Sequence, residues 1–360
     1  MIVHKVPIVE NGTLNGHICH QQFFTGSLKS LQYSFETDSA GIGHPKHGPS
    51  LPGLAGQDVY GHTSQSIYVA DGHGKNGAEI AKKSIPLVSI LENAMNDIAL
   101  ETPYHAEQTL RSLVVNYITN LYEPKSGCTF TQMTFIQRGS KRWAITVNVG
   151  DSEALLVFKD KIQICSFAHV WDNKDLYQRY IKHSVIQKPV CYNRWNASSY
   201  KLKNKNGEYR PMMLYTVKKK KVFIHEENAK WISTLWQRRS KPRIRYGTQS
   251  VRVPANPHEN WGSCVLIGGQ ARGQVMATIG DNIEREQSGV PFELVHVYIH
   301  EIPPYEDVIG VVQSDGISNK LSVKECGLRA WSSKNAKDYI KNIYKPRDDM
   351  SVGIAYSFSK

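Results

Sequence analysis

The chain has 360 residues, 40% of them hydrophobic, and a formal net charge of +12 at pH 7. A chain of this length can bury a full core, as one large domain or two small ones. It has no apolar stretch of membrane-spanning length, and its first residues (MIVHKVPIVENG) lack the features of a signal peptide. We therefore expect an intracellular protein, cytoplasmic or nuclear, that has no membrane partner.

The cysteines point to the same kind of compartment. They are spread along the chain without a CxxC pair and without a Cys/His cluster of zinc spacing. Their positions are Cys19, Cys128, Cys165, Cys191, Cys264 and Cys326. Free buried thiols in a reducing compartment are the expected state, and a disulfide framework is not.

The positive charge is concentrated in one segment. Residues 180–260 hold 18 Lys and Arg against 4 Asp and Glu, whereas the rest of the chain holds 26 against 28. A near-neutral body with a basic insertion differs from a uniformly basic protein, because only the insertion would attract anionic partners. We predict a single domain over residues 1–360 that carries this insertion at 185–260.

The insertion combines basic runs with aromatic residues. It contains KKKKVFIHEE (218–227) and QRRSKPRIR (237–245), and its tryptophans are Trp195, Trp231 and Trp236. Because of these aromatics, a small folded flap is expected rather than a disordered tail. Its charge suits contact with nucleic acid, an acidic protein or a phosphorylated peptide, although no recognised nucleic-acid-binding motif is present.

The first hundred residues change from extended to helical patterning. Residues 1–35 are predicted to be an entry segment with edge strands, and 38–56, rich in Gly, Pro and His, an irregular loop. The run SIYVA (66–70) is strand-like by its length and flanks. Apolar residues then recur at helical spacing over 78–100, where Pro86 is predicted to kink or split the helix.

A second amphipathic helix is predicted over 105–123, after which the period falls to two. The strand candidates before the insertion are 130–137, 143–150, 153–159 and 161–167, and those after it are 264–269, 294–302, 308–314 and 351–358. A helical stretch is predicted over 322–344. This order favours an α/β (α+β) architecture of two packed antiparallel β-sheets, a β-sandwich, flanked by α-helices.

Aspartates stand at the ends of several of these strands. Asp71 follows SIYVA, Asp315 follows VIGVVQS, and the pair Asp348–Asp349 precedes MSVGIAY, while Asp58 lies upstream in GQDVYG. Carboxylates that converge from separate strands suit a hard divalent cation, which offsets their mutual repulsion. Two such ions about 3.5–4 Å apart can drive phosphomonoester hydrolysis. No cysteine-nucleophile motif and no GxSxG elbow argues for covalent catalysis.

The local contexts of these aspartates are specific. They are DGHG (71–74), GDSEALLV (150–157), SDGIS (314–318) and RDDMSVGIAY (347–356). In this order they resemble the metal-dependent protein phosphatases of the type-2C (PPM) family. CTFTQMTFIQ, ITVNVGDSEALLV, SFAHVWDNKDLYQRYI (166–181) and GQVMATIGDN (273–282) extend the resemblance over most of the chain outside the insertion.

The resemblance implies a Mn2+- or Mg2+-dependent serine/threonine phosphatase that attacks a phosphorylated protein with a metal-bridging hydroxide. It implies that Asp71 bridges two ions with help from the Gly72 carbonyl. Asp58 would support this centre, and Asp315 and Asp348 would complete it.

His73 falls where the family has a proposed general acid for the leaving oxygen, a role that suits the ordinary pKa of histidine.

The chain departs from the family at the phosphate-binding arginine, where Gly53 stands instead. Lys46 is predicted to take its place, with His44 and His47 in the same loop as alternatives. A lysine would supply a point charge and not the bidentate fork of an arginine.

Other departures concern the accessory positions. Asp151 matches an aspartate linked to a third, weaker metal, but its usual partner four residues after Asp315 is Asn319 here. The missing charge argues against a third ion. Glu153 stands where the family usually has an arginine, and Asp349 where asparagine is commoner.

Two other hypotheses therefore remain beside the active enzyme, for which a monomer is the expected state. In one, the chain is a pseudophosphatase that acts as a binding or regulatory module, as Gly53, Glu153 and Asn319 suggest. In the other, the basic insertion binds nucleic acid, which is compatible with catalysis because an insertion can localise an enzyme.

Overall fold

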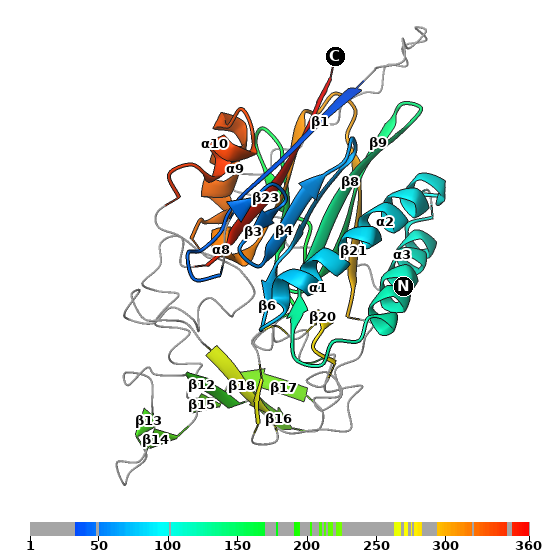
Figure 1. Ribbon diagram of the computed structural model, residues 1–360. Helices are drawn as coiled ribbons and strands as arrows, with labels where there is room; N and C mark the ends of the chain where they lie inside the picture. Colours follow the sequence, from blue (N-terminus) through cyan, green and yellow to red (C-terminus); the bar gives the residue numbers. More distant parts are fainter. Residues whose placement is uncertain are drawn as a thin grey trace, which may run out of the picture.

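The computed structural model describes residues 33–47, 50–100, 102–169, 277–282, 294–318, 320–343 and 348–359, with residues 178 and 275 and the backbone of short strands between 191 and 272. Two antiparallel sheets pack against each other, and helices cover their outer faces (Figure 1). This confirms the predicted fold class. Within the described residues, no helix is both long and apolar enough to span a membrane.

The larger sheet has seven strands in the order β2-β3-β4-β5-β8-β9-β21, and each pairs antiparallel with its neighbours. Their bounds are Ser50–Leu51, Leu54–Ala55, Asp58–His62, Ser66–Ala70, Phe130–Arg138, Lys141–Val149 and His296–Ile302. The central strands β8 and β9 are buried on both faces, because one face meets helices and the other meets the second sheet.

The smaller sheet has five strands in the order β1-β23-β22-β10-β11. Their bounds are Tyr33–Ile42, Met350–Ser359, Val308–Gln313, Glu153–Val157 and Ile162–Ile164. The prediction of an irregular loop over 38–56 was wrong in part, since β1 pairs with β23 along all ten residues as far as Ile42. Gly41 allows this pairing because a Cβ there would lie 2.4 Å from the Tyr60 ring.

A three-stranded ribbon, β20-β7-β6, lies beside the larger sheet. Its strands are Ile279–Gly280, Gly127–Cys128 and Gly72–His73. The ribbon continues the chain from Asp71, and its middle strand β7 pairs with residues 72–73 on one side and with residues 279–280, far away in the sequence, on the other.

Helices α1 (Gly77–Lys83), α2 (Ile85–Asp97) and α3 (Pro103–Asn120) cover the outer face of the larger sheet (Figure 1). The predicted split of 78–100 is confirmed. Ser84 separates α1 from α2, and Pro86 lies in the first turn of α2, where its missing N–H breaks no helical hydrogen bond.

The outer face of the smaller sheet carries α8 (Asp315–Ser318), α9 (Val323–Ser332) and α10 (Ala336–Ile340) (Figure 1). The helical stretch predicted over 322–344 is thus two helices. It divides because Asn335 caps α10, accepting a hydrogen bond from the Asp338 amide at 2.9 Å.

The core between the two sheets consists of alternate strand residues. Ile67 and Phe135 of the larger sheet and Leu156, Val312 and Ala355 of the smaller one belong to a single buried cluster. Each large apolar side chain buried here contributes about 1.5–3 kcal/mol. This core holds the strands rigid, and with them the residues at the strand ends.

Short strands are described both in the basic segment and just after it: Cys191–Arg194, Leu202–Lys203, Tyr209–Arg210, Met212–Met213, Tyr215–Lys218 and Lys221–Ile224 lie within the segment, and Ser263–Ile267 and Gln270–Arg272 follow it. They are β12 to β19 and form the sheets β15-β12-β18-β19, β13-β14 and β16-β17.

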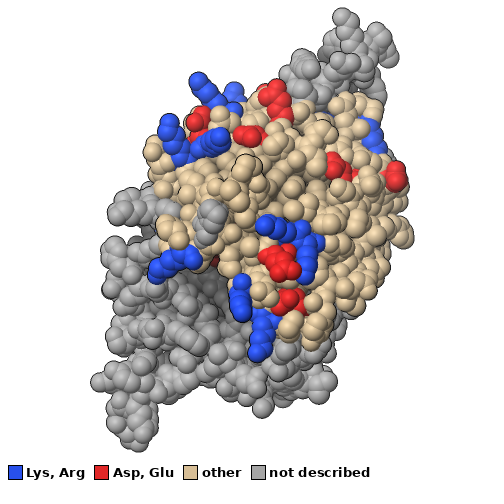
Figure 2. Space-filling view, in the orientation of Figure 1, with Lys and Arg blue, Asp and Glu red and all other residues tan. Residues whose placement is uncertain are grey.

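The run at 237–245, the three tryptophans and Asn319 lie outside the described residues. On the body itself, the visible face shows basic and acidic side chains interspersed (Figure 2). The single domain with an inserted flap stays a prediction.

Candidate metal centre

Asp58 and Asp71 lie opposite each other at the end of the β4–β5 hairpin. Val59 pairs with Ala70, so one step further along the same register Asp58 faces Asp71. Asp58 is buried, with 1% of its surface exposed. The Asp71 amide donates to the Thr129 hydroxyl at 3.1 Å, which fixes the backbone where the chain leaves the sheet.

The second sheet brings Asp315 and Asp348 to the same end of the sandwich. β22 and β23 are antiparallel and pair Gln313 with Val352. The Ser314 amide continues this ladder to the Ser351 carbonyl at 3.0 Å. Asp315 therefore comes just after one strand and Asp348 just before its neighbour.

Two hydrogen bonds join the sheets at this end. The Ser351 hydroxyl donates to Asp58 Oδ2 at 2.8 Å, and the Gln57 amide donates to Asp349 Oδ2 at 2.8 Å. The His44 amide also donates to Asp349 Oδ1, at 2.6 Å. Asp349 thus fastens the loop between β1 and β4 to β23, a structural role that sequence reasoning did not assign.

The carboxylates are close enough to oppose one another's ionisation. Burial raises the pKa of Asp71 well above its usual range, and the charges of Asp58, Asp315, Asp348 and Asp151 raise it further. Burial likewise raises the pKa of Asp348 to about 7, with Asp315 as the next cause. These aspartates, all predicted from the sequence, therefore act on one another.

Asp58 shows the same effect. Burial raises its pKa well above the usual range, and Asp349 and Asp348 add to the rise, whereas the hydrogen bond from Ser351 opposes it. Crowded, desolvated carboxylates of this kind are the donor set that Mg2+ and Mn2+ accept. The residues present therefore fit a divalent metal.

The fit is uneven among the predicted ligands. Within the described residues, the set of three acidic or histidine side chains whose ligand atoms lie within 4.8 Å of one another is His47, Asp348 and Asp349. Asp348 was predicted as a ligand, but His47 and Asp349 were not. Asp58, Asp71 and Asp315 are outside this set, but their charges interact with that of Asp348, and they lie at the ends of neighbouring strands.

Gly72 leaves no room for a side chain. A Cβ there would lie 2.4 Å from the Gln57 carbonyl oxygen and 2.6 Å from the Gly77 carbonyl carbon. Glycine at this position lets strand β6 pass close to the start of α1, directly after Asp71.

His73 makes a close contact with an acidic residue that sequence reasoning missed. Its Nε2 lies 2.5 Å from Asp281 Oδ2, and the Thr278 hydroxyl donates to the same oxygen at 2.9 Å. Asp281 belongs to GQVMATIGDN, a segment included in the family resemblance. Nothing in the sequence indicated that this aspartate contacts His73. The carboxylate holds the imidazole in one orientation.

Lys46, the predicted phosphate ligand, makes no hydrogen bond or ion pair with the aspartates in the part of the chain that the structure describes. Lys46 has an exposed side chain, and its amide donates to His44 Nδ1 at 3.2 Å. Gly53 has φ +77, a left-handed conformation that an arginine would adopt only with strain. An arginine at position 53 would therefore strain the backbone.

The accessory residues differ in role. Asp151 follows Gly150 on the β9–β10 connection and is within electrostatic reach of Asp71. Glu153 is buried in β10 and accepts a hydrogen bond from Gln313 Nε2 at 2.7 Å. Glu153 is therefore a structural residue of the smaller sheet.

Comparisons with known proteins give structural matches alone, since no family model and no curated protein sequence matches the chain. One match is the serine/threonine phosphatase Stp1 from Staphylococcus aureus, at 14% identity and TM-score 0.47, covering 94% of this chain and 99% of that one.

Another is the PPM Ser-Thr phosphatase MsPP from Mycobacterium smegmatis, at 14% identity and TM-score 0.43, covering 91% and 99%. A third is the catalytic domain of the serine/threonine protein phosphatase PstP in complex with two manganese ions, at 11% identity and TM-score 0.44, covering 91% and 100%. At such low identities, the likeness does not extend to activity or substrate.

Proposed function

We propose that the chain is a metal-dependent protein serine/threonine phosphatase that uses two Mn2+ or Mg2+ ions. The observation that carries this proposal is the crowding of carboxylates where the two sheets meet, which raises the pKa of Asp71 through burial and through the charges of Asp58, Asp315 and Asp348. A hard divalent cation would turn this repulsion into attraction.

In this proposal the strand ends hold the ligands. Asp71 and the Gly72 carbonyl would hold the ions together with Asp58, Asp315 and Asp348 from the flanking strands. When bound, the ions supply a nucleophile at neutral pH and neutralise the phosphate charge. Asp151 is the candidate ligand of a third, weaker ion.

The other roles fall to His73 and Lys46. His73 would donate a proton to the leaving oxygen of the substrate, with Asp281 fixing its ring through the 2.5 Å contact. Lys46, which is exposed on the loop after β1, would contribute a positive charge to phosphate binding.

The partner is a phosphorylated protein, which the basic insertion would recruit inside the cell. The insertion would equally suit an acidic partner or nucleic acid, and the enzyme is expected to act as a monomer.

The proposal is tested by hydrolysis of a small aryl phosphate and of a phosphoserine peptide, with and without Mn2+. Turnover should require Mn2+ and should be lost in Asp71→Asn and Asp315→Ala, but not in Asp160→Asn, which changes an exposed aspartate of a distant turn. Full activity in both ligand variants would rule the assignment out. A folded protein that binds Mn2+ without turnover would instead be a binding module, as the missing arginine at Gly53 suggests.

A further inference from the structure

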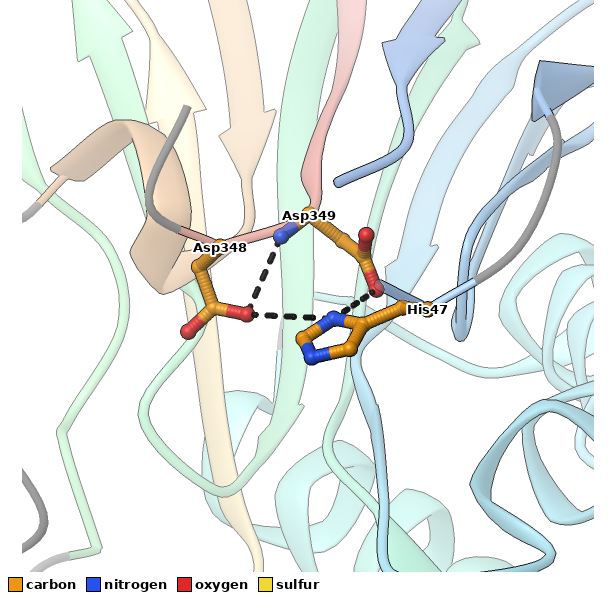
Figure 3. A group of neighbouring side chains, drawn as sticks. All are labelled: His47, Asp348 and Asp349. Atoms are coloured by element: carbon orange, nitrogen blue, oxygen red, sulfur yellow. Dashed lines mark hydrogen bonds and ion pairs between the residues drawn. The ribbon is translucent and has the colours of Figure 1, made fainter. Parts of the chain in front are cut away.

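His47 points its ring toward the acidic pair at the start of β23. Its Nδ1 lies 3.0 Å from Asp349 Oδ2 and 3.9 Å from Asp348 Oδ1 (Figure 3). The three residues come from opposite ends of the chain, because His47 belongs to the loop after β1. The imidazole nitrogen thus faces a carboxylate of the proposed metal centre.

The spacing of the three donor atoms suits a single cation. With bonds of about 2.1 Å, adjacent ligands of an octahedral ion lie about 3 Å apart and opposite ligands about 4.2 Å apart. The separations of 3.0 and 3.9 Å fall between these values. All three ligand atoms lie within 4.8 Å of one another, so they can approach one ion together.

The charges at this position are unbalanced without a cation. Asp349 is 3% exposed, and its neighbour Asp348 adds a second negative charge. Among the described residues, His47 is the only basic side chain within 4.0 Å of either carboxylate. The Asp348 side chain is 54% exposed, so the cost falls on the buried Asp349 carboxylate, which no lysine or arginine among the described residues offsets and which a bound cation would stabilise.

We propose that His47 Nδ1, Asp348 Oδ1 and Asp349 Oδ2 bind one of the two divalent ions, and that the nitrogen makes this position select Co2+, Fe2+ or Zn2+ over Mg2+. The inference rests on the proposed function and names the metal class of one position. Imidazole binds later first-row ions more readily than Mg2+, which prefers oxygen donors. Asp349 can keep its amide hydrogen bonds, since an ionised carboxylate accepts about four.

The competing explanation is a purely structural contact. Asp349 already accepts hydrogen bonds from the amides of His44 and Gln57, so His47 could be a third clamp on the same loop. That explanation predicts a loss of thermal stability on removing His47 and no change in metal preference.

The test uses the full chain, freed of metal, titrated with Co2+ and separately with Mg2+ in a calorimeter, together with the Co2+ absorption spectrum. His47→Gln should lower Co2+ affinity by at least about tenfold, leave Mg2+ affinity nearly unchanged and shift the Co2+ bands. His105→Gln is the control: it changes an exposed histidine of α3, on the outer face of the larger sheet, and it should behave as wild type.

A second variant guards against misfolding. His47→Asp replaces nitrogen by oxygen, so it should retain Mg2+ while losing the preference for Co2+. Unchanged Co2+ affinity and spectrum in both His47 variants, with binding lost in Asp71→Asn, would overturn the inference and leave the metal centre standing. A wild-type protein that binds neither ion would overturn the proposed function and the inference together.

Discussion

The Ser351 hydroxyl donates a hydrogen bond to Asp58 Oδ2 at 2.8 Å, and this bond crosses from one sheet of the sandwich to the other. Both residues are buried, Ser351 with 0% and Asp58 with 1% of the surface exposed. The bond orients a carboxylate whose pKa is raised by burial, and it opposes that rise. It therefore links the packing of the two sheets to the geometry of the proposed metal centre.

Removing this bond should weaken metal binding more than it weakens the fold. In Ser351→Ala, Asp58 loses its orienting donor, and we expect Mn2+ affinity to fall by about tenfold, as for other groups that orient a metal ligand. The free energy of unfolding should fall by about 1 kcal/mol. Calorimetric Mn2+ titration and chemical denaturation measure the two effects.

Ser66→Ala is the matched control for that variant. Ser66 is also fully buried and hydrogen-bonds Thr134 at 2.8 Å, but on the strands of the larger sheet. It should cost a similar free energy of unfolding without changing Mn2+ affinity. Equal losses of affinity in both variants would show that the Ser351 effect is one of general stability.

The metal-free protein should lose stability as the pH rises from about 4 to 7. The pKa of Asp348 is raised to about 7, and those of Asp58 and Asp71 are raised as well, in each case first by burial. The folded chain therefore binds more protons than the unfolded chain in this window, so raising the pH favours unfolding. Each pKa unit corresponds to about 1.4 kcal/mol before solvent screening.

Thermal denaturation with a chelator at pH 5 and pH 7.5 measures this effect. Asp71→Asn removes one of the repelling charges, so its melting temperature should fall less between the two pH values than that of the wild type. Saturating Mn2+ should restore the wild-type melting temperature at pH 7.5 but not that of the variant. A metal-free wild type that is stabilised between pH 5 and 7.5 more than Asp71→Asn would contradict the raised pKa values.

Hydrophobic periodicity was sufficient to predict the sandwich. Strands such as Val308–Gln313 and Met350–Ser359 are short apolar runs with the expected bounds, because their burial on both faces requires apolar side chains. Polar segments were less predictable. The Gly-rich residues up to Ile42 form part of β1 because β23 supplies a partner strand, and local composition does not record such a partner.

Sequence reasoning brought the right aspartates together but missed the residues that contact them. Asp281 follows Gly280 and is separated from His73 by more than two hundred positions, so local spacing could not link them. Asp349 was noted only as a replacement for asparagine, although it fastens the loop that carries His47. Contacts of this kind depend on the register of both sheets, which a single sequence does not contain.

Asp281 should affect catalysis through His73 and not through the metal. In Asp281→Asn, the imidazole loses its charged partner at 2.5 Å, and we expect turnover of a phosphoserine peptide to fall by about ten- to a hundredfold. An aryl phosphate has a good leaving group that needs little protonation, so its turnover should fall much less. Mn2+ affinity should stay as in the wild type; equal losses on both substrates would argue against a role in proton donation.

Two thiols should be inert in the native protein. Cys128 and Cys165 are 0% and 1% exposed, and burial raises the pKa of each thiol above its usual range, so the reactive thiolate is scarce at neutral pH. Iodoacetamide labelling followed by peptide mass spectrometry should modify neither residue until a denaturant is added. Rapid labelling of either thiol at pH 7.5 in the folded chain would contradict their placement in the core.

Restoring an arginine at Gly53 should not improve the enzyme. Gly53 follows Pro52 in the turn between β2 and β3, and its φ of +77 is the conformation that such a turn requires at its second central residue. Gly53→Arg and Gly53→Ala should each lower the free energy of unfolding by about 1–2 kcal/mol, because the strain lies in the backbone. Gly53→Asn should cost less, since asparagine tolerates this conformation.

Denaturant unfolding of the three variants, with phosphatase assays on each, decides the matter. If the backbone strain dominates, Gly53→Ala and Gly53→Arg lose similar stability and Gly53→Asn loses less, with no rise in turnover for Gly53→Arg. A more active and equally stable Gly53→Arg variant would show that the turn can adapt. That result would mean that the wild-type chain lacks a positive charge at the phosphate, and that Lys46 does not supply one.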